Sequence, residues 1–281
     1  MNRNITANSF RDLSLSGKFF RILSEPAKAY RESLYKILSV IGQRSYTPFV
    51  ILTRDRTGSN MLVQYLNSHP SIRCDYEVLC TLDGRSGPAL VESIYGKQPF
   101  NIKAKGFKIF YYHPSDADQL SVAETWSALQ SIPNLHLIHL RRLNLLETAV
   151  SSKIAYESGV YGDLRKVPKS LSKAIESVEI KTTIYPIEKL QAAFEKTRQW
   201  EDEYPNRFPN CPSLETTYEA LVTQPQVELR KICTFLGCTE PFRLKTNFQK
   251  QRTKSLRSVV ENYAELKEYF AESSWSEFFT E

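Results

Sequence analysis

Residue types that bind anions are concentrated just after residue 53. The segment FVILTRDRTGSNML places Arg56, Thr57, Gly58 and Ser59 directly behind an apolar run at 49–53. Backbone N–H groups at a helix start, hydroxyl donors and a guanidinium all bind phosphate-like oxygens. A glycine also lets the backbone approach such an anion closely. We expect an anion-binding loop here; the alternative is an ordinary strand–helix turn with a surface arginine.

A second group of such residues lies in LHLIHLRRLNLLETAVSS, at 135–152, where an apolar run ends in Arg141 and Arg142 and Ser151 follows. A phosphate-loop kinase needs an aspartate after this strand to hold magnesium, and its loop ends in Gly-Lys-Ser/Thr. Neither feature is present. Two arginines and a hydroxyl predict a second phosphate site that uses no metal, although a pair of surface arginines closing the strand is the alternative. Together the two sites fit one ligand with two separated phosphate groups.

Three segments taken together resemble the signature blocks of sulfotransferases that use 3′-phosphoadenylyl sulfate (PAPS). They are RTGSNMLVQYLNSHPSI, HLRRLNLLETAVS and YEALVTQPQVELRKICTFLG, and the resemblance extends over roughly residues 48–266. It is closer to the bacterial carbohydrate and lipid-sugar branch than to the phenol branch, whose loop carries a lysine. The resemblance implies sulfuryl transfer from PAPS, released as adenosine 3′,5′-bisphosphate, to a carbohydrate, glycolipid or related hydroxyl. A phosphate-loop kinase or NTPase and a nucleotide-binding module without turnover remain the alternatives.

The resemblance also implies roles for individual residues. Those assigned to the 5′-phosphosulfate are Arg56, Thr57, Gly58, Ser59, Asn60 and Met61. Ser151 is assigned to the 3′-phosphate with Arg142 or Arg141, which precede it by nine and ten residues, so both arginines stay candidates. Tyr218 is expected near the adenine. In the block QKQRTKSLRSVVENY, Lys250 is expected to reach the cofactor, with Arg252 and Lys254 as alternatives.

Sulfuryl transfer to a hydroxyl needs a base, groups that stabilise the charge on the transferring oxygens, and groups that stabilise the leaving phosphate. Arg56 and the helix start can meet the last two needs. Glu77, which follows a short strand expected beside the loop, is the predicted general base; the alternatives are a solvated carboxylate and an ion-pair partner of Arg54 or Arg73. His113 is the second candidate for the base, and Lys108 is a candidate to replace the missing loop lysine, or simply a strand-edge lysine.

Alternating apolar and amphipathic segments must position these residues. Repeated strand–helix units predict an α/β fold, with a phosphate-loop-like parallel sheet of about five strands and helices on both faces. Segments 78–105 and 158–185 lack a readable motif, and we expect the first to be a long ligand-facing loop. Strands are expected at 48–53, 71–76, 106–112, 134–140 and 213–218, and helices at 59–68, 122–132, 144–158, 186–204, 225–237 and 255–266.

The net charge of the 281 residues is +6, and most of it lies near the start. Residues 1–45 hold eight Lys/Arg against three acidic residues, whereas the rest of the chain holds 29 against 28, so no nucleic-acid partner is expected. We predict a basic amphipathic helical extension at 1–45 and a single sulfotransferase-like α/β domain at 46–281. The extension either packs on the protein, including a second subunit of a homodimer, or lies on an anionic membrane surface.

Cysteine usage and hydropathy indicate the compartment. The five cysteines are scattered without a C-x-x-C pair, which favours reduced thiols. The first residues lack a signal-peptide pattern, and no apolar run reaches the roughly 18 residues of a membrane span. We therefore expect a cytoplasmic protein whose only membrane contact would be peripheral.

Overall fold

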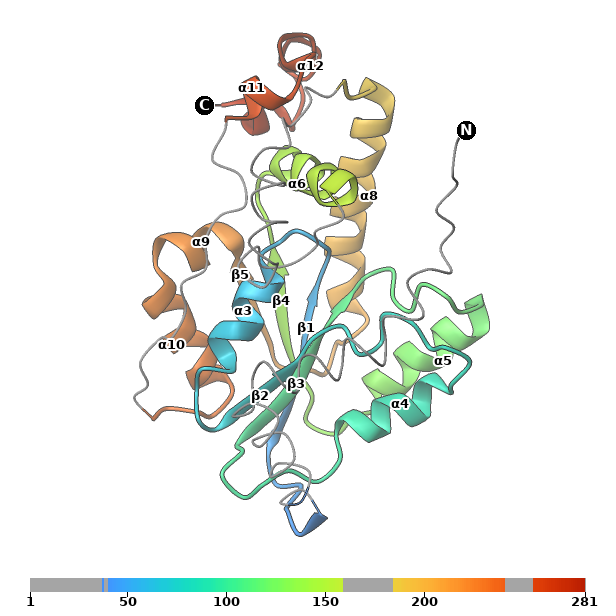
Figure 1. Ribbon diagram of the computed structural model, residues 1–281, viewed down its shortest axis with the longest axis vertical. Coiled ribbons are helices and arrows are strands. Elements are labelled where there is room, and N and C mark those ends of the chain that lie inside the picture. Colours follow the sequence, from blue (N-terminus) through green and yellow to red (C-terminus); the bar gives the residue numbers. More distant parts are fainter. Residues whose placement is uncertain (1–36, 38–39, 159–183, 241–254, 281) are drawn as a thin grey trace, which may run out of the picture. The chain divides into compact units, whose positions relative to one another are not determined.

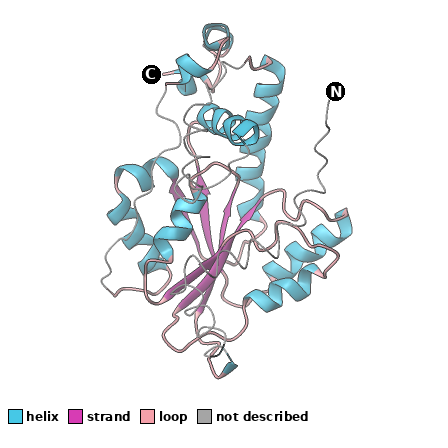
Figure 2. Ribbon diagram, in the orientation of Figure 1, coloured by secondary structure: helices cyan, strands magenta, loops and turns pink. Residues whose placement is uncertain are grey.

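Five parallel strands form the central sheet, in the order β2-β3-β1-β4-β5. The computed structural model describes residues 37, 40–158, 184–240 and 255–280. The predicted α/β class, with a parallel sheet between two helical layers, is confirmed (Figures 1 and 2). The strands are β1 (Thr47–Thr53), β2 (Ile72–Asp75), β3 (Ala104–Phe110), β4 (His136–Arg141) and β5 (Ser213–Thr217).

Helices cover both faces of the sheet and its carboxyl end. On one face the apolar core contains residues of α3 (Ser59–Leu66), α9 (Tyr218–Thr223) and α10 (Pro225–Phe235). The core of the other face includes residues of α4 (Gly87–Ile94), α5 (Gln119–Gln130) and the end of α8 (Ile187–Asn206). A third cluster, beyond the carboxyl ends of the strands, unites the start of α8 with α6 (Leu145–Ser158), α11 (Leu256–Val259), α12 (Tyr263–Tyr269) and η3 (Ser276–Phe279) (Figure 1).

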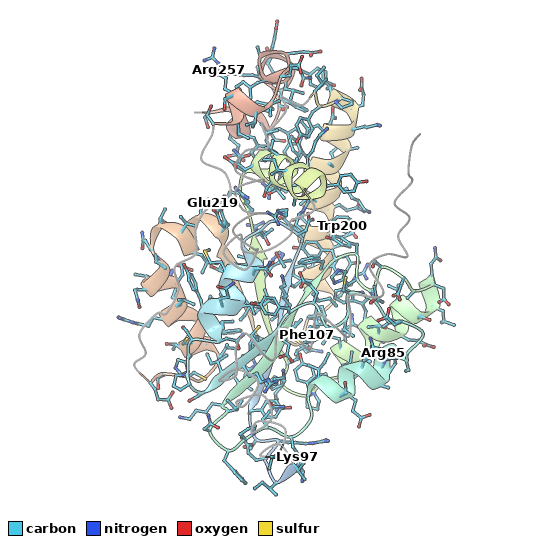
Figure 3. All side chains as sticks on the ribbon, in the orientation of Figure 1. Arg85, Lys97, Phe107, Trp200, Glu219 and Arg257 are labelled. Atoms are coloured by element: carbon cyan, nitrogen blue, oxygen red, sulfur yellow. The ribbon has the colours of Figure 1, made fainter. Side chains whose placement is uncertain are left out.

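Alternation along the strands assigns each side chain to one face. In β1, Phe49 and Ile51 join the core under α3, while Val50 and Leu52 join the core on the α5 side. In β3, Phe107 (labelled in Figure 3) and Ile109 belong to the α5 side. Lys108 and Phe110, which alternate with them, therefore face α3. The polar residues of the candidate site follow the same alternation.

Three expectations need correction. The segment 78–105 contains α4, which the Ser86 hydroxyl caps by accepting a hydrogen bond from Ala89 N–H at 3.4 Å, so it is not one long loop. The helix expected at 255–266 is two short helices, because Val260 is extended between them. Strand β2 does not neighbour β1, because β3 lies between them, so Glu77 is not beside the loop through direct strand pairing. Nearly all of 158–185 lies outside the described residues.

The chain divides into two compact units, and one of them joins the described residues up to Ser45 with Gly96–Asn101. Within that unit Gln43 and Gln98 form an antiparallel bridge, with both N–H···O distances at 2.8 Å. Most of the predicted extension at 1–45 lies outside the described residues, so its helical form and its contacts stay predictions. Among the helices that the structure describes, none combines the length and the apolar character needed to cross a membrane.

Candidate active site

The loop between β1 and α3 has a tight, left-handed geometry. Arg56 and Gly58 have φ of 63° and 78°, and Gly58 immediately precedes α3. A Cβ on Gly58 would lie 2.6 Å from Cδ2 of Tyr218, so the start of α9 packs directly against the loop. The Thr57 hydroxyl is buried and donates to the Arg54 carbonyl at 3.0 Å. That hydroxyl therefore stabilises the loop itself, and the backbone N–H groups of α3 are the donors that remain for an anion.

Arg142 connects this loop to the second predicted phosphate site. Its Nη1 donates to the Arg56 carbonyl at 3.1 Å, and its Nη2 donates to Glu147 Oε2 at 3.1 Å. The guanidinium lies 4.4 Å from the centre of the Tyr218 ring, an arrangement typical of cation–π contact. Arg56 Nε donates to Ser151 Oγ at 3.0 Å. Residues predicted from two separate motifs thus form one connected cluster.

Arg141 points to the other face of the sheet. Its Nη2 lies 3.6 Å from Glu215 Oε2, and Glu215 also contacts the buried ring of His139 at 3.4 Å. Arg142 follows the alternation of Ile138 and Leu140, which belong to the core under α3. The structure therefore brings Arg142, and not Arg141, to the loop, whose Arg56 contacts Ser151.

Lys108 joins the predicted base to the helix start. Its side chain is 1% exposed, and its Nζ lies 2.7 Å from Glu77 Oε1, 2.5 Å from Asn60 Oδ1 and 3.3 Å from Ser59 Oγ. Burial lowers the pKa of Lys108, and the Glu77 carboxylate opposes that shift. The partner of Glu77 is thus a lysine, not Arg54 or Arg73. Although β2 is not adjacent to β1, Lys108 on the intervening β3 bridges the gap.

His113 lies near this group but is committed to its own loop. It is buried, its ring centre is 4.7 Å from that of Phe110, and its Nδ1 accepts a hydrogen bond from Phe110 N–H at 3.4 Å. Burial lowers the pKa of His113 to about 4, and the charge of Glu77 opposes the shift. The ring is therefore neutral near pH 7. Its Nδ1 lone pair is occupied by the Phe110 N–H, so this nitrogen is not available to take a proton from an acceptor.

Other predicted residues have plain structural positions. The Met61 side chain is part of the core under α3, which leaves only its backbone for a ligand. Asp116 accepts hydrogen bonds from the N–H groups of Leu82 and Asp83, and Asp118 caps α5. Tyr218 is the first residue of α9. The next residue, Glu219 (labelled in Figure 3), accepts a hydrogen bond from Leu143 N–H, just after β4, at 3.2 Å. Lys250, like Arg252 and Lys254, lies outside the described residues.

Two acidic residues of the site were not anticipated from the sequence. Glu147 binds Arg142, and Asp55 lies within the anion loop itself, where it contacts Arg54 at 3.3 Å and accepts from the Ser152 hydroxyl at 2.5 Å. The negative charge of Asp55 could have drawn attention to it in the sequence. A carboxylate inside a loop that is expected to bind an anion is unfavourable unless other groups hold it away from the anion. Glu147 gave a weaker signal, as an acidic residue one turn after an arginine pair.

The fold and the site define an α/β protein with a tight, arginine-containing loop between β1 and α3 at the carboxyl end of its sheet. No protein-family model matches the chain. Among curated proteins, Nodulation protein H of Rhizobium tropici is 26% identical over 249 residues, which cover 83% of this chain and 92% of that protein. Nodulation protein H of Rhizobium meliloti is 25% identical over 250 residues, covering 83% and 94%.

Solved structures that align with most of this chain include proteins named sulfotransferases. A sulfotransferase from Alicyclobacillus acidocaldarius gives a TM-score of 0.46 at 16% identity, covering 80% of this chain and 91% of that one. The mouse sulfotransferase SULT7A1, complexed with PAP, gives 0.41 at 14% identity, covering 86% and 91%. The resemblance to sulfotransferases that the motifs predict is confirmed.

Proposed function

We propose that the protein is a PAPS-dependent sulfotransferase that transfers the sulfuryl group to a hydroxyl of a carbohydrate, glycolipid or related acceptor. The observation that carries the proposal is the position of Lys108. One ammonium contacts the candidate base Glu77 and, at the same time, Ser59 and Asn60 at the start of α3. A base for the acceptor and a cation for the transferred group are therefore direct neighbours, so both can act on one bound pair of substrates.

In the proposed reaction, Glu77 accepts the proton of the acceptor hydroxyl. The acceptor oxygen then forms a bond to sulfur, and the bond between sulfur and the bridging phosphate oxygen breaks. Its electron pair stays on the phosphate of adenosine 3′,5′-bisphosphate. Lys108 and the N-terminal N–H groups of α3 stabilise the negative charge that develops on this oxygen and on the sulfuryl oxygens. Lys108 thus supplies the positive charge that the loop, which has no lysine, lacks.

The remaining cluster is suited to the rest of the donor. Arg56 in the loop donates a hydrogen bond to Ser151 of the second predicted phosphate site. Arg142 donates to the Arg56 carbonyl and packs against the Tyr218 ring. A guanidinium and a hydroxyl match the oxygens of a phosphate monoester. We assign Arg142 and Ser151 to the 3′-phosphate and the start of α3 to the 5′-phosphosulfate. All charge stabilisation in this assignment comes from protein groups, so the transfer needs no metal.

Calorimetry with adenosine 3′,5′-bisphosphate tests the donor site, and transfer of labelled sulfate from PAPS to a glycan panel tests the reaction. We expect the bisphosphate to bind in the presence of EDTA and transfer to proceed without magnesium. Absence of bisphosphate binding would overturn the proposal. Binding without transfer to any acceptor would instead favour a nucleotide-binding module, and ATP binding that requires magnesium would favour a kinase or NTPase.

The role of Glu77 has its own test. Glu77→Gln keeps the shape of the side chain but removes the base, so turnover should fall by roughly 10²–10⁴-fold. Affinity for the bisphosphate should stay near that of the unchanged protein. The matched control is Glu92→Gln on the exposed face of α4, where activity should not change. Full activity of Glu77→Gln would remove Glu77 as the base, and His113→Gln would then be the next variant to measure.

A further inference from the structure

A row of aromatic rings borders the Lys108–Glu77 pair, at the carboxyl ends of β2 and β3. The ring centre of Tyr112 lies 5.5 Å from that of Phe110 and 5.9 Å from that of Trp200 on α8 (Figure 3 labels Trp200). Tyr76 and Phe110 flank the Lys108 ammonium, with ring centres 5.6 Å and 5.2 Å from Nζ. The row therefore continues from α8 to the candidate base.

Two members of this row are exposed although they stand beside buried charges. Tyr112 is 41% exposed and Tyr76 is 40% exposed, whereas Phe110 between them is 8% exposed. Single exposed aromatic residues are common and need no explanation. Here, however, both exposed rings lie at the same edge as Glu77 and Lys108, which places open apolar surface next to the proposed chemistry.

Tyr112 is held rigidly. Besides its contacts with Phe110 and Trp200, its ring meets the His113 ring edge to face at 5.2 Å. Burial and then the charge of the nearby Asp55 carboxylate raise the pKa of Tyr112. Asp55 itself is fixed by Arg54 and by Ser152 of α6. This arrangement also explains the carboxylate inside the anion loop, because Asp55 is bound by groups on both sides. A ring fixed in this way loses little conformational freedom when a ligand covers it.

We propose that Tyr112 and Tyr76 bind the acceptor, and that the acceptor is a saccharide whose apolar ring face packs on Tyr112. The inference rests on the proposed function and names its acceptor surface. A sugar ring has one face of C–H groups that an exposed aromatic ring can cover, while its hydroxyls remain free to reach Glu77. A phenol would gain comparable free energy only from an enclosed apolar slot, and the two tyrosines are open.

The test compares Tyr112→Leu and Tyr112→Phe in transfer assays with PAPS, with neutral hexose oligosaccharides and a simple phenol as acceptors. Tyr112→Phe keeps the ring, so the saccharide KM should stay within about twofold. Tyr112→Leu loses the stacking surface, and the saccharide KM should rise by roughly two- to tenfold, as expected from 0.5–1.5 kcal/mol per aromatic contact. Tyr76→Leu should act in the same direction and provides a second variant if Tyr112→Leu folds poorly.

Two controls separate this inference from the proposed function. Bisphosphate affinity, measured by calorimetry, should be the same in all of these variants, because neither tyrosine ring is among the groups assigned to the donor. Tyr269→Leu on α12, a tyrosine 55% exposed, should leave both KM values unchanged. If the protein does not bind the bisphosphate, the proposed function fails and this inference with it. If the bisphosphate binds but Tyr112→Leu and Tyr76→Leu leave the saccharide KM unchanged, or the phenol alone is sulfated, this inference is overturned while the donor site stands.

Discussion

At the scale of single residues, the site depends on which side of a strand a charge occupies. Arg141 and Arg142 are adjacent in sequence, but Arg142 reaches the Arg56 carbonyl while Arg141 reaches Glu215. The side of Arg142 could have been predicted, because it continues the alternation of Ile138 and Leu140, both inside the core under α3. The partner of Glu77 could not, since its contact with Lys108 depends on which strand lies next to β1.

The two arginines should therefore differ in their effect on donor binding. Arg142→Ala removes a guanidinium that contacts the Arg56 carbonyl, and it should weaken bisphosphate binding by roughly 10- to 100-fold, the usual loss for a hydrogen bond to a charged group. Arg141→Ala should change the affinity by less than about threefold. Isothermal titration calorimetry measures both, and a melting curve identifies any loss of folding when Glu147 loses its partner. Equal losses of affinity in the two variants would contradict the assignment.

At the scale of elements, the anion loop is shaped by a helix from the far end of the sequence. Tyr218 begins α9 and packs on Gly58, although 160 residues separate them. Apolar periodicity predicted the five strands and the helices α3, α5, α6, α8 and α10, because each of these elements buries one face or both. It could not predict that β3 lies between β1 and β2, since strand order depends on contacts between distant segments. The helix α4 was missed although Ser86 and Pro88 form a typical helix start.

A comparison of Gly58 with Gly84 separates the effect of the Tyr218 contact on stability from the effect of the left-handed backbone. Gly58 and Gly84 have φ of 78° and 75°, but a Cβ on Gly84 would meet no atom within 4 Å. Both alanine variants lose about 1–2 kcal/mol from the left-handed backbone. Gly58→Ala should lose about 1–3 kcal/mol more from overpacking against Tyr218 and should also weaken bisphosphate binding. Urea unfolding measures the difference, and equal losses of stability in the two variants would show that Tyr218 moves away freely.

At the scale of the whole molecule, two buried histidines link folding to pH. His113 lies beneath the aromatic row, and His139 lies inside the sheet, with its Nε2 2.7 Å from the Tyr111 hydroxyl. Burial lowers the pKa of His139, although Glu215 opposes the shift, and it lowers the pKa of His113 to about 4. Both rings are therefore neutral in the folded protein under conditions in which an exposed histidine begins to take up a proton.

Stability should consequently fall as the solution becomes acidic. The folded-state pKa of each histidine lies below the unfolded value, so the stabilisation is complete above about pH 6.5 and is lost as pH falls toward 4. For His113 the shift from 6.5 to about 4 corresponds to roughly 3 kcal/mol. Urea unfolding at intervals from pH 7.5 to pH 4.5 measures this slope. His139→Gln should make the slope shallower; a slope that does not respond to His139→Gln would mean that other groups cause the acid sensitivity.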